Sequence, residues 1–128
     1  MNESLFIDWV DHEWCWKANK KKFKICINSD ISVYHHLGQK NNYEFVNGYP
    51  RFTFDRYYYI FRNGFYLALY SQFVPMSWRI NIFFTVIKYI FGFLLIEKFN
   101  LRYCLLTINS IYDGFTKKMG KNNKLNDV

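Results

Sequence analysis

The sequence predicts a mostly helical chain, with three long helices and two or three short strands. Three observations carry this prediction. Apolar residues recur at three- and four-residue spacing between Asn100 and Thr116, as on one face of a helix. Val74-Pro75 separates two long helical segments, because proline ends a helix. Phe23 to Ile27 alternates apolar and polar residues with period two, which is typical of a strand.

The short elements are expected in the first fifty residues. A helix is predicted from about Val10 to Lys21, with lysines in its last turn that suit the negative end of the helix dipole. Strands are predicted at Phe23–Ile27 and Ile31–His35, on either side of an Asn28-Ser29-Asp30 turn. Two short strands cannot form a stable sheet alone. Gln39 to Arg51 reads as a polar loop.

The long helices are expected in the second half of the chain. Phe52 to Gln72 is predicted as a helix that Thr53 opens, and Asn100 to Thr116 as another. Met76 to Ile96 is the longest apolar stretch. Its polar residues are Arg79, Asn81, Thr85 and Lys88. It therefore fails as a clean membrane span of about 20 apolar residues. A helix with so broad an apolar face lies in a membrane interface or is covered on several sides.

The charge is unevenly distributed and favours an anionic partner. The net charge is +7, yet residues 1–13 hold four acids and no Lys or Arg. The other 115 residues hold all 17 bases against 6 acids. An acidic start and a basic body fit lipid headgroups, a nucleotide diphosphate or nucleic acid. Aromatic residues make up 23% of the chain, which suggests a membrane surface or a partner that covers them.

Three carboxylates lie close together in the first predicted helix and just before it. Asp8, Asp11 and Glu13 stand among large apolar residues. Burial raises a carboxylate pKa toward neutrality, so such residues are candidates for proton transfer. The alternative is that Asp8 or Asp11 simply caps the helix.

The stretch that holds these carboxylates resembles a known enzyme segment. Phe6 to Ala18 resembles the segment F-I-D-x-V-D-x-E-W-C-x-R-A, which carries the catalytic aspartate in family-two (GT-A) glycosyltransferases of the rhamnosyltransferase-like branch. Lys17 replaces the usual arginine, and Lys22 replaces a usual glycine. Three later stretches resemble the branch's H-x-L-G motif, its motif of arginines, tyrosines and a final Arg-Asn, and its closing motif: His35–Gly38, Arg56–Asn63 and Asp113–Lys121.

The resemblance implies an α/β fold, of which this chain is the C-terminal fragment. Residues 1–50 are expected to end a Rossmann-like GT-A catalytic domain, and residues 51–128 to form a helical, membrane-associating extension. The implied reaction transfers a sugar from a nucleotide-diphosphate donor to a lipid-linked polysaccharide acceptor, such as an O-antigen precursor. The sequence has no D-x-D motif, which holds the metal and nucleotide in such enzymes. We therefore expect a truncated chain that is inactive alone.

The resemblance also implies roles for individual residues. Asp11 is expected to act as the general base. Mg²⁺ or Mn²⁺ is expected at the donor diphosphate, with His35 completing the metal site. The expected substrate-binding residues are Glu13, Lys17, Arg56 and Arg62. From the residues alone, a His-His pair in a loop is more often structural. The arginines equally fit surface charges that lie over aromatic rings.

The expected location is the cytoplasmic face of the plasma membrane, with peripheral attachment through an anionic surface. A basic tail follows the last helix: Lys117, Lys118, Lys121 and Lys124. The main alternative to the enzyme fragment is a non-catalytic peripheral membrane protein. A nucleic-acid binder is a second alternative, because tyrosines could stack on bases. The carboxylate cluster and the lack of a known nucleic-acid-binding motif argue against it.

Overall fold

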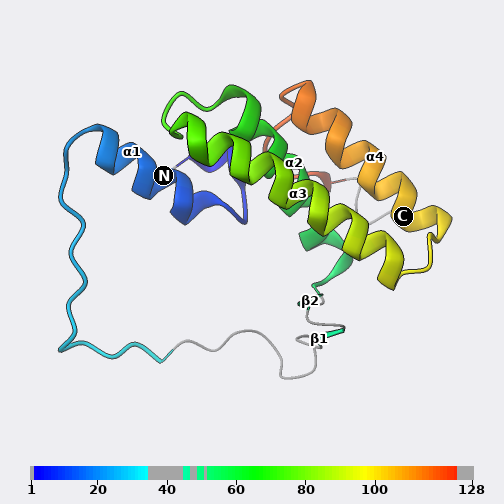
Figure 1. The fold of residues 1–128 in the computed structure, drawn as a ribbon, viewed down its shortest axis with the longest axis horizontal. Coiled ribbons are helices and arrows are strands. Elements are labelled where there is room, and N and C mark those ends of the chain that lie inside the picture. The colour runs from blue at the N-terminus through cyan, green and yellow to red at the C-terminus, as the bar shows by residue number, and fades with distance from the viewer. Residues whose placement is uncertain (1, 35–44, 47–48, 51, 124–128) are drawn as a thin grey trace.

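The fold is built around one central helix, α2 (Figure 1). The computed structural model describes residues 2–34, 45–46, 49–50 and 52–123. A short 3-10 helix, η1, spans Glu3–Leu5 and leads into α1 at Val10–Lys20. The three long helices follow in the second half of the chain. They are α2 at Phe54–Tyr70, α3 at Met76–Ile96 and α4 at Leu101–Phe115.

These helix bounds agree closely with the periodicity and the breakers in the sequence. Thr53 is the N-cap of α2, although its side chain makes no capping bond. Pro75 stands at the N-cap of α3, where the missing N–H costs nothing. Asn100 caps α4, since its side-chain oxygen accepts a hydrogen bond from the backbone N–H of Arg102 at 2.9 Å. Local signals therefore suffice to place the three long helices.

The expected α/β class is wrong, because the described residues form an all-helical fold. Phe23–Ile27 and Ile31–Tyr34 are extended but pair with no strand in the described ranges. This segment runs away from the helices (Figure 1). The only ladder among the described residues joins β1 at Phe45–Val46 to β2 at Tyr49–Pro50, two residues each, within the predicted polar loop. Period-two alternation gives a strand only where a second strand supplies its hydrogen bonds.

Aromatic rings fill the core between α2, α3 and the start of α4. The Tyr57 and Phe93 ring centroids lie 4.1 Å apart, and Phe61 lies 5.6 Å from Phe93. Tyr103 of α4 meets the same Phe93 ring edge-on at 5.2 Å. Tilted and edge-on pairs of this kind add to the stabilisation that comes from burial. One phenylalanine of α3 therefore joins all three long helices.

Gly114 brings α4 against the backbone of α2. A Cβ atom at Gly114 would lie 2.8 Å from the Arg62 carbonyl oxygen and 3.1 Å from the Phe65 Cβ. Real Cβ atoms do not approach a backbone oxygen so closely. The sequence needs glycine here for the approach of the two helices, and the residue is helical rather than left-handed.

The start of α1 packs on α2, and its later turns reach the α2–α3 connection. The Trp9 indole N–H donates to the Ile60 carbonyl of α2 at 3.0 Å. Trp16 lies 6.0 Å from Trp78 of α3, and Lys20 donates to the backbone carbonyl of Gln72 at 2.5 Å. These contacts hold α1 at one end of the bundle (Figure 1).

Large apolar side chains remain exposed along α3 and α4. Past the first turn of α3 they are Ile80, Phe84, Phe91 and Leu95, and on α4 they are Leu101, Leu105, Ile108, Tyr112 and Phe115. We call these nine residues the apolar face. By length and composition alone, α3 could cross a membrane, and it is the one helix in the described part of the chain that could. Phe99 continues the exposed apolar residues across the connection between the two helices.

Candidate functional site

The carboxylate-bearing segment is held by the side chain of Asn63, which α2 presents at its centre. The Asn63 amide nitrogen donates to the carbonyl oxygens of Leu5 at 2.8 Å and Ile7 at 2.7 Å, and it lies 3.3 Å from that of Asp8. Asn63 is fully buried. A buried amide that donates hydrogen bonds to several backbone carbonyls fixes the path of the chain between those carbonyls.

Arg62 makes the second set of contacts to this segment. Its Nη2 donates to the Leu5 carbonyl at 3.2 Å, its Nη1 to the Gly120 carbonyl at 2.6 Å, and its Nε to the Asn63 side-chain oxygen at 3.0 Å. Only 1% of Arg62 is exposed. One guanidinium therefore ties the N-terminal segment and the C-terminal tail to α2. The proposed substrate role of Arg62 stays a prediction, and these contacts are structural ones that the sequence reading did not foresee.

The segment that Asn63 and Arg62 hold has an unusual backbone. Phe6, Asp8 and Trp9 have positive φ values of 63°, 59° and 63°. Left-handed backbone costs free energy in residues other than glycine, and it persists only where surrounding contacts enforce it. The hydrogen bonds from Asn63 and Arg62 supply that enforcement. Strain of this kind often marks a functional segment.

Asp8 forms an ion pair with Arg56 at the start of α2. Arg56 Nε lies 3.1 Å from Asp8 Oδ1, and 12% of the Asp8 side chain is exposed. Asp8 Oδ2 is buried and has no hydrogen-bond partner among the described residues. Burial raises the pKa of Asp8, and the nearby Arg56 charge and hydrogen bond only partly oppose that shift. The first arginine of the Arg56–Asn63 stretch thus meets the first aspartate of the Phe6–Ala18 stretch.

The three carboxylates have three different environments. Asp11 is exposed in the first turn of α1. Only 3% of Glu13 is exposed, and its Oε2 is buried without a partner in the part of the chain that the structure describes. The capping alternative for Asp8 or Asp11 is wrong, because Trp9 is the N-cap and makes no side-chain capping bond. Asp11 is therefore the carboxylate of the three that is most open to solvent.

The other predicted site residues lie apart from Asp8 and Arg56 or outside the described ranges. Lys17 Nζ lies 5.3 Å from the centre of the Phe73 ring, and Lys17 also lines an open groove of about 620 Å³ at the end of α1. His35 and the rest of its H-x-L-G motif fall outside the described residues. Within the ranges that are described, no three His, Cys, Asp or Glu side chains come together as a metal site would require.

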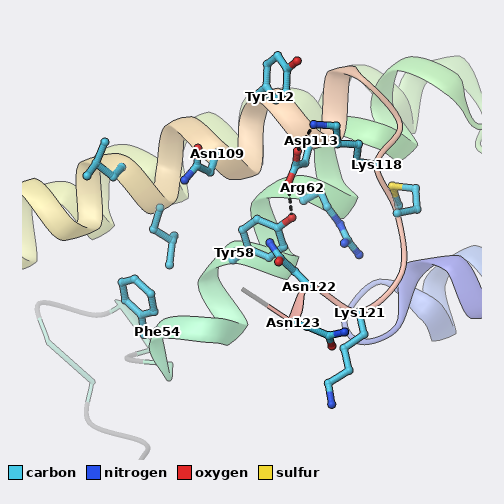
Figure 2. Close-up of a pocket in the computed structure, with 13 residues that line it drawn as sticks. Phe54, Tyr58, Arg62, Asn109, Tyr112, Asp113, Lys118, Lys121, Asn122 and Asn123 are labelled. Carbon is cyan, nitrogen blue, oxygen red and sulfur yellow. Dashed lines mark hydrogen bonds and ion pairs between the residues drawn. The ribbon is translucent and has the colours of Figure 1, made fainter. Parts of the chain in front are cut away.

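A larger pocket lies between α2, α4 and the C-terminal tail (Figure 2). Its volume is about 710 Å³. The residues that line it are Phe54, Tyr58, Arg62, Leu105, Leu106, Asn109, Tyr112, Asp113, Lys118, Met119, Lys121, Asn122 and Asn123. We call it the tail pocket. Of its residues, the sequence predicted a substrate role for Arg62 and an anionic-surface role for Lys118 and Lys121, but no pocket.

Three polar groups, joined by one hydrogen bond and one ion pair, form one side of the tail pocket. The Tyr58 hydroxyl donates to Asp113 Oδ2 at 2.6 Å, and Lys118 Nζ lies 3.8 Å from Asp113 Oδ1 (Figure 2). Burial, together with the hydrogen bond to Asp113, raises the pKa of Tyr58 to about 12. Both Tyr58 and Asp113 lie inside stretches that resemble the glycosyltransferase motifs. The resemblance indicated that the stretches around Tyr58 and Asp113 matter, but only the fold shows that the two side chains form a hydrogen bond.

Comparison with known proteins gives one partial match. The chain is 37% identical over 76 residues to a protein described as dTDP-rhamnosyl transferase RfbF from Shigella flexneri. The match covers 59% of this chain and 25% of that protein, so the chain spans about a quarter of the length of the relative. No protein-family model matches the chain. No solved structure matches it either. The chain thus has a weak and partial relationship to a glycosyltransferase.

Proposed function

We propose that these 128 residues form the acceptor-side part of a rhamnosyltransferase-like glycosyltransferase of the GT-A kind. The reaction moves a sugar from a nucleotide diphosphate to a lipid-linked saccharide. The observation that supports this proposal best is the partial similarity to a rhamnosyl transferase. The contacts of Arg56, Arg62 and Asn63 add support, because they bring two of the resembling stretches together around the carboxylates.

Asp11 acts as the general base in this proposal. It takes the proton from an acceptor hydroxyl, the hydroxyl oxygen bonds to the anomeric carbon, and the bond from that carbon to the diphosphate breaks. Asp11 suits this role because it is exposed, whereas Asp8 is paired with Arg56 and Glu13 is buried. The strained turn before α1, which α2 holds in place, fixes where Asp11 stands.

The larger part of the donor and metal site is assigned to a different polypeptide segment. The sequence has no D-x-D motif, and the described residues contain no three-ligand metal cluster. A divalent cation would offset the negative charge that develops on the leaving diphosphate. We propose that His35 contributes to that site and that Glu13, Lys17, Arg56 and Arg62 support substrate binding. The 128 residues alone are therefore proposed to be inactive.

The test of this proposal supplies the missing part in trans. The chain is combined with the part of the Shigella flexneri relative that it does not match, together with dTDP-rhamnose, Mg²⁺ and a lipid-linked acceptor. Nucleotide diphosphate release is measured. We expect release only from the combination, and at least a hundredfold loss with Asp11→Asn, since general-base catalysis contributes about 10²–10⁴-fold. The control Asp30→Asn, an exposed carboxylate in a turn, should keep full activity.

Three results would contradict the proposal. Release that survives Asp11→Asn in the combination would remove Asp11 as the base. Release by the chain alone would show that its own residues bind the donor. If the combination stays silent while both parts are folded, the glycosyltransferase assignment loses its support.

A peripheral attachment to the cytoplasmic face of the plasma membrane completes the proposal. The apolar face of α3 and α4 supports it, because large exposed apolar patches mark interaction surfaces. The same helices and their connections carry exposed basic residues: Lys88 on α3, Lys98 and Arg102 at the α3–α4 connection, and Lys117, Lys118 and Lys121 after α4. The same observation favours the alternative function, a peripheral membrane protein without catalysis.

Membrane binding is tested with liposomes that contain anionic lipid. An interfacial helix gains about 25 cal/mol per Å² of buried apolar area, and each lysine near the surface adds about 1 kcal/mol that salt screens. Replacing Phe84, Phe91 and Leu95 with Ser should remove most of the binding that survives high salt. Replacing Lys117, Lys118, Lys121 and Lys124 with Gln should remove most of the salt dependence. A folded chain that stays in the supernatant at low salt would refute membrane attachment.

A further inference from the structure

The buried charge of Arg62 is the starting observation. Its guanidinium is almost fully buried, and no carboxylate lies within ion-pair distance of it among the described residues. Its partners are two backbone carbonyls and one amide oxygen, with the Tyr58 and Tyr59 rings at 5.4 and 4.9 Å. A buried charge without a counter-charge is costly, and an anion close by would lower that cost.

Arg62 lines the tail pocket, and the rest of the lining is also suited to an anion. The charged lining residues are Arg62, Lys118 and Lys121 against Asp113 alone, a balance of two positive charges. Three of the five Arg62 N–H groups donate to described residues, which leaves two for a ligand. The exposed side-chain amides of Asn109 and Asn123 add neutral donors at the rim.

The tail pocket adjoins the apolar face. Leu105 and Tyr112 line the pocket, and they are also exposed members of the apolar face, at 47% and 56%. Figure 2 shows Tyr112 and Lys118 on the α4 side of the pocket and Lys121 on the tail side. A ligand with a phosphate in the pocket could therefore lay an apolar portion along α4.

We infer that the tail pocket is a binding site for a phosphate or diphosphate group, carried by a lipid that lies along α4. Lys118 and Lys121 supply positive charge at the exposed rim of the pocket, and Arg62 supplies the buried positive charge of its lining. The Tyr58 hydroxyl donates a hydrogen bond to Asp113, so fewer lone pairs of the Asp113 carboxylate are left to repel the anion. This inference deepens the membrane attachment proposed above by naming the group that is recognised.

Two probes separate the phosphate group from its carrier. The first is inorganic pyrophosphate, measured by isothermal titration calorimetry with the full chain. The second is a pair of vesicles of matched surface charge, one with phosphatidic acid and one with phosphatidylserine, measured by flotation. We expect pyrophosphate to bind and the chain to favour phosphatidic acid at least threefold, because its phosphate monoester can enter the pocket. Pyrophosphate should compete with the phosphatidic acid vesicles.

Three variants test the charge balance, and Arg62 itself is left intact because it holds the fold together. Lys118→Gln with Lys121→Gln should weaken pyrophosphate binding at least tenfold. The control Lys22→Gln with Lys24→Gln removes the same charge from an exposed segment that does not line the pocket, and it should change binding less than twofold. Asp113→Asn removes the single acid of the lining and should tighten binding three- to tenfold.

The outcomes divide cleanly. Equal weakening by the two lysine pairs would show only general charge attraction and would overturn the inference. Pyrophosphate binding that Asp113→Asn weakens, in a chain that circular dichroism shows to be folded, would show that the Asp113 charge does not oppose the anion and would also overturn the inference. Pyrophosphate binding without a preference for phosphatidic acid would overturn the lipid carrier and leave a soluble phosphate ligand. None of these results depends on sugar transfer, so a silent transfer assay leaves this test intact.

Discussion

Asn63 is predicted to stabilise the whole N-terminal segment through hydrogen-bond donation. Its amide makes two buried bonds, at 2.8 and 2.7 Å, to carbonyls of a segment with positive φ values. A net hydrogen bond contributes about 1 kcal/mol, and a buried group that loses its partner costs about 1–3 kcal/mol. Asn63→Ala should therefore lower the free energy of unfolding by about 2–4 kcal/mol.

Asn63→Asp separates donation from size and charge. Aspartate has nearly the same volume as asparagine and could pair with Arg62, so a site that needs only packing or charge would accept it. A carboxylate cannot donate, however, and it would face the Leu5 and Ile7 carbonyl oxygens. We expect Asn63→Asp to be at least as destabilising as Asn63→Ala. Asn81→Ala, at an exposed asparagine of α3, should change the stability by less than about 0.5 kcal/mol.

Urea unfolding gives the free energies, and amide hydrogen exchange locates the effect. The m-value should stay constant if only the native state loses contacts. Protection should fall most over residues 5–10, because that segment is tied directly to Asn63. The reasoning would be refuted if Asn63→Asp kept wild-type stability, or if exchange over residues 5–10 were unchanged in both variants.

Three further predictions concern α2 and its neighbours. Gly114→Ala should lower the free energy of unfolding by about 1–3 kcal/mol, because the new Cβ meets the Arg62 carbonyl oxygen. This loss is expected although alanine has the better helix propensity. Urea unfolding measures the change, and a stabilised variant would show that α2 and α4 can separate freely. Asp8→Asn should gain stability relative to wild type as pH rises from 4 to 7. The raised pKa of Asp8 stabilises the native state of the wild type below pH 3.8, and this contribution is lost as the carboxyl ionises at higher pH. A difference in melting temperature that does not depend on pH would contradict this. Tyr58→Phe should lower the free energy of unfolding by about 1–2 kcal/mol at pH 7, because it removes the hydrogen bond to Asp113. In the wild type, the raised pKa of Tyr58 predicts a loss of stability between pH 10 and about 12, and Tyr58→Phe should reduce that loss. An unchanged stability profile at alkaline pH would contradict this.

The long helices could be predicted from sequence because their signals are local. Met76–Ile96 was predicted at its observed bounds, and the other two long helices within two residues at each end. Proline, a capping asparagine and three- to four-residue periodicity all act within a turn or two of the chain. The same local reasoning failed for Phe23–Ile27, because a strand depends on a partner that its own sequence cannot supply.

The composition of the candidate site was visible in the sequence, but its arrangement was not. The sequence named Asp8, Asp11 and Glu13 as one cluster. The fold gives them a paired, an exposed and a buried environment, because each points in a different direction at the start of α1. No spacing rule predicts that outcome, since burial depends on what packs against each side chain.

The sequence by itself determined the helices, the uneven charge and the apolar residues of α3 and α4. The tertiary structure decided which residues more than fifty positions apart meet. Arg62 reaches Leu5 and Gly120, and Tyr58 reaches Asp113, so stretches that resemble separate motifs become one cluster around α2. The physical reason is that a buried guanidinium or amide must satisfy its donors wherever the packed backbone places acceptors, and only the packing of α2 and α4 with the two terminal segments sets those places.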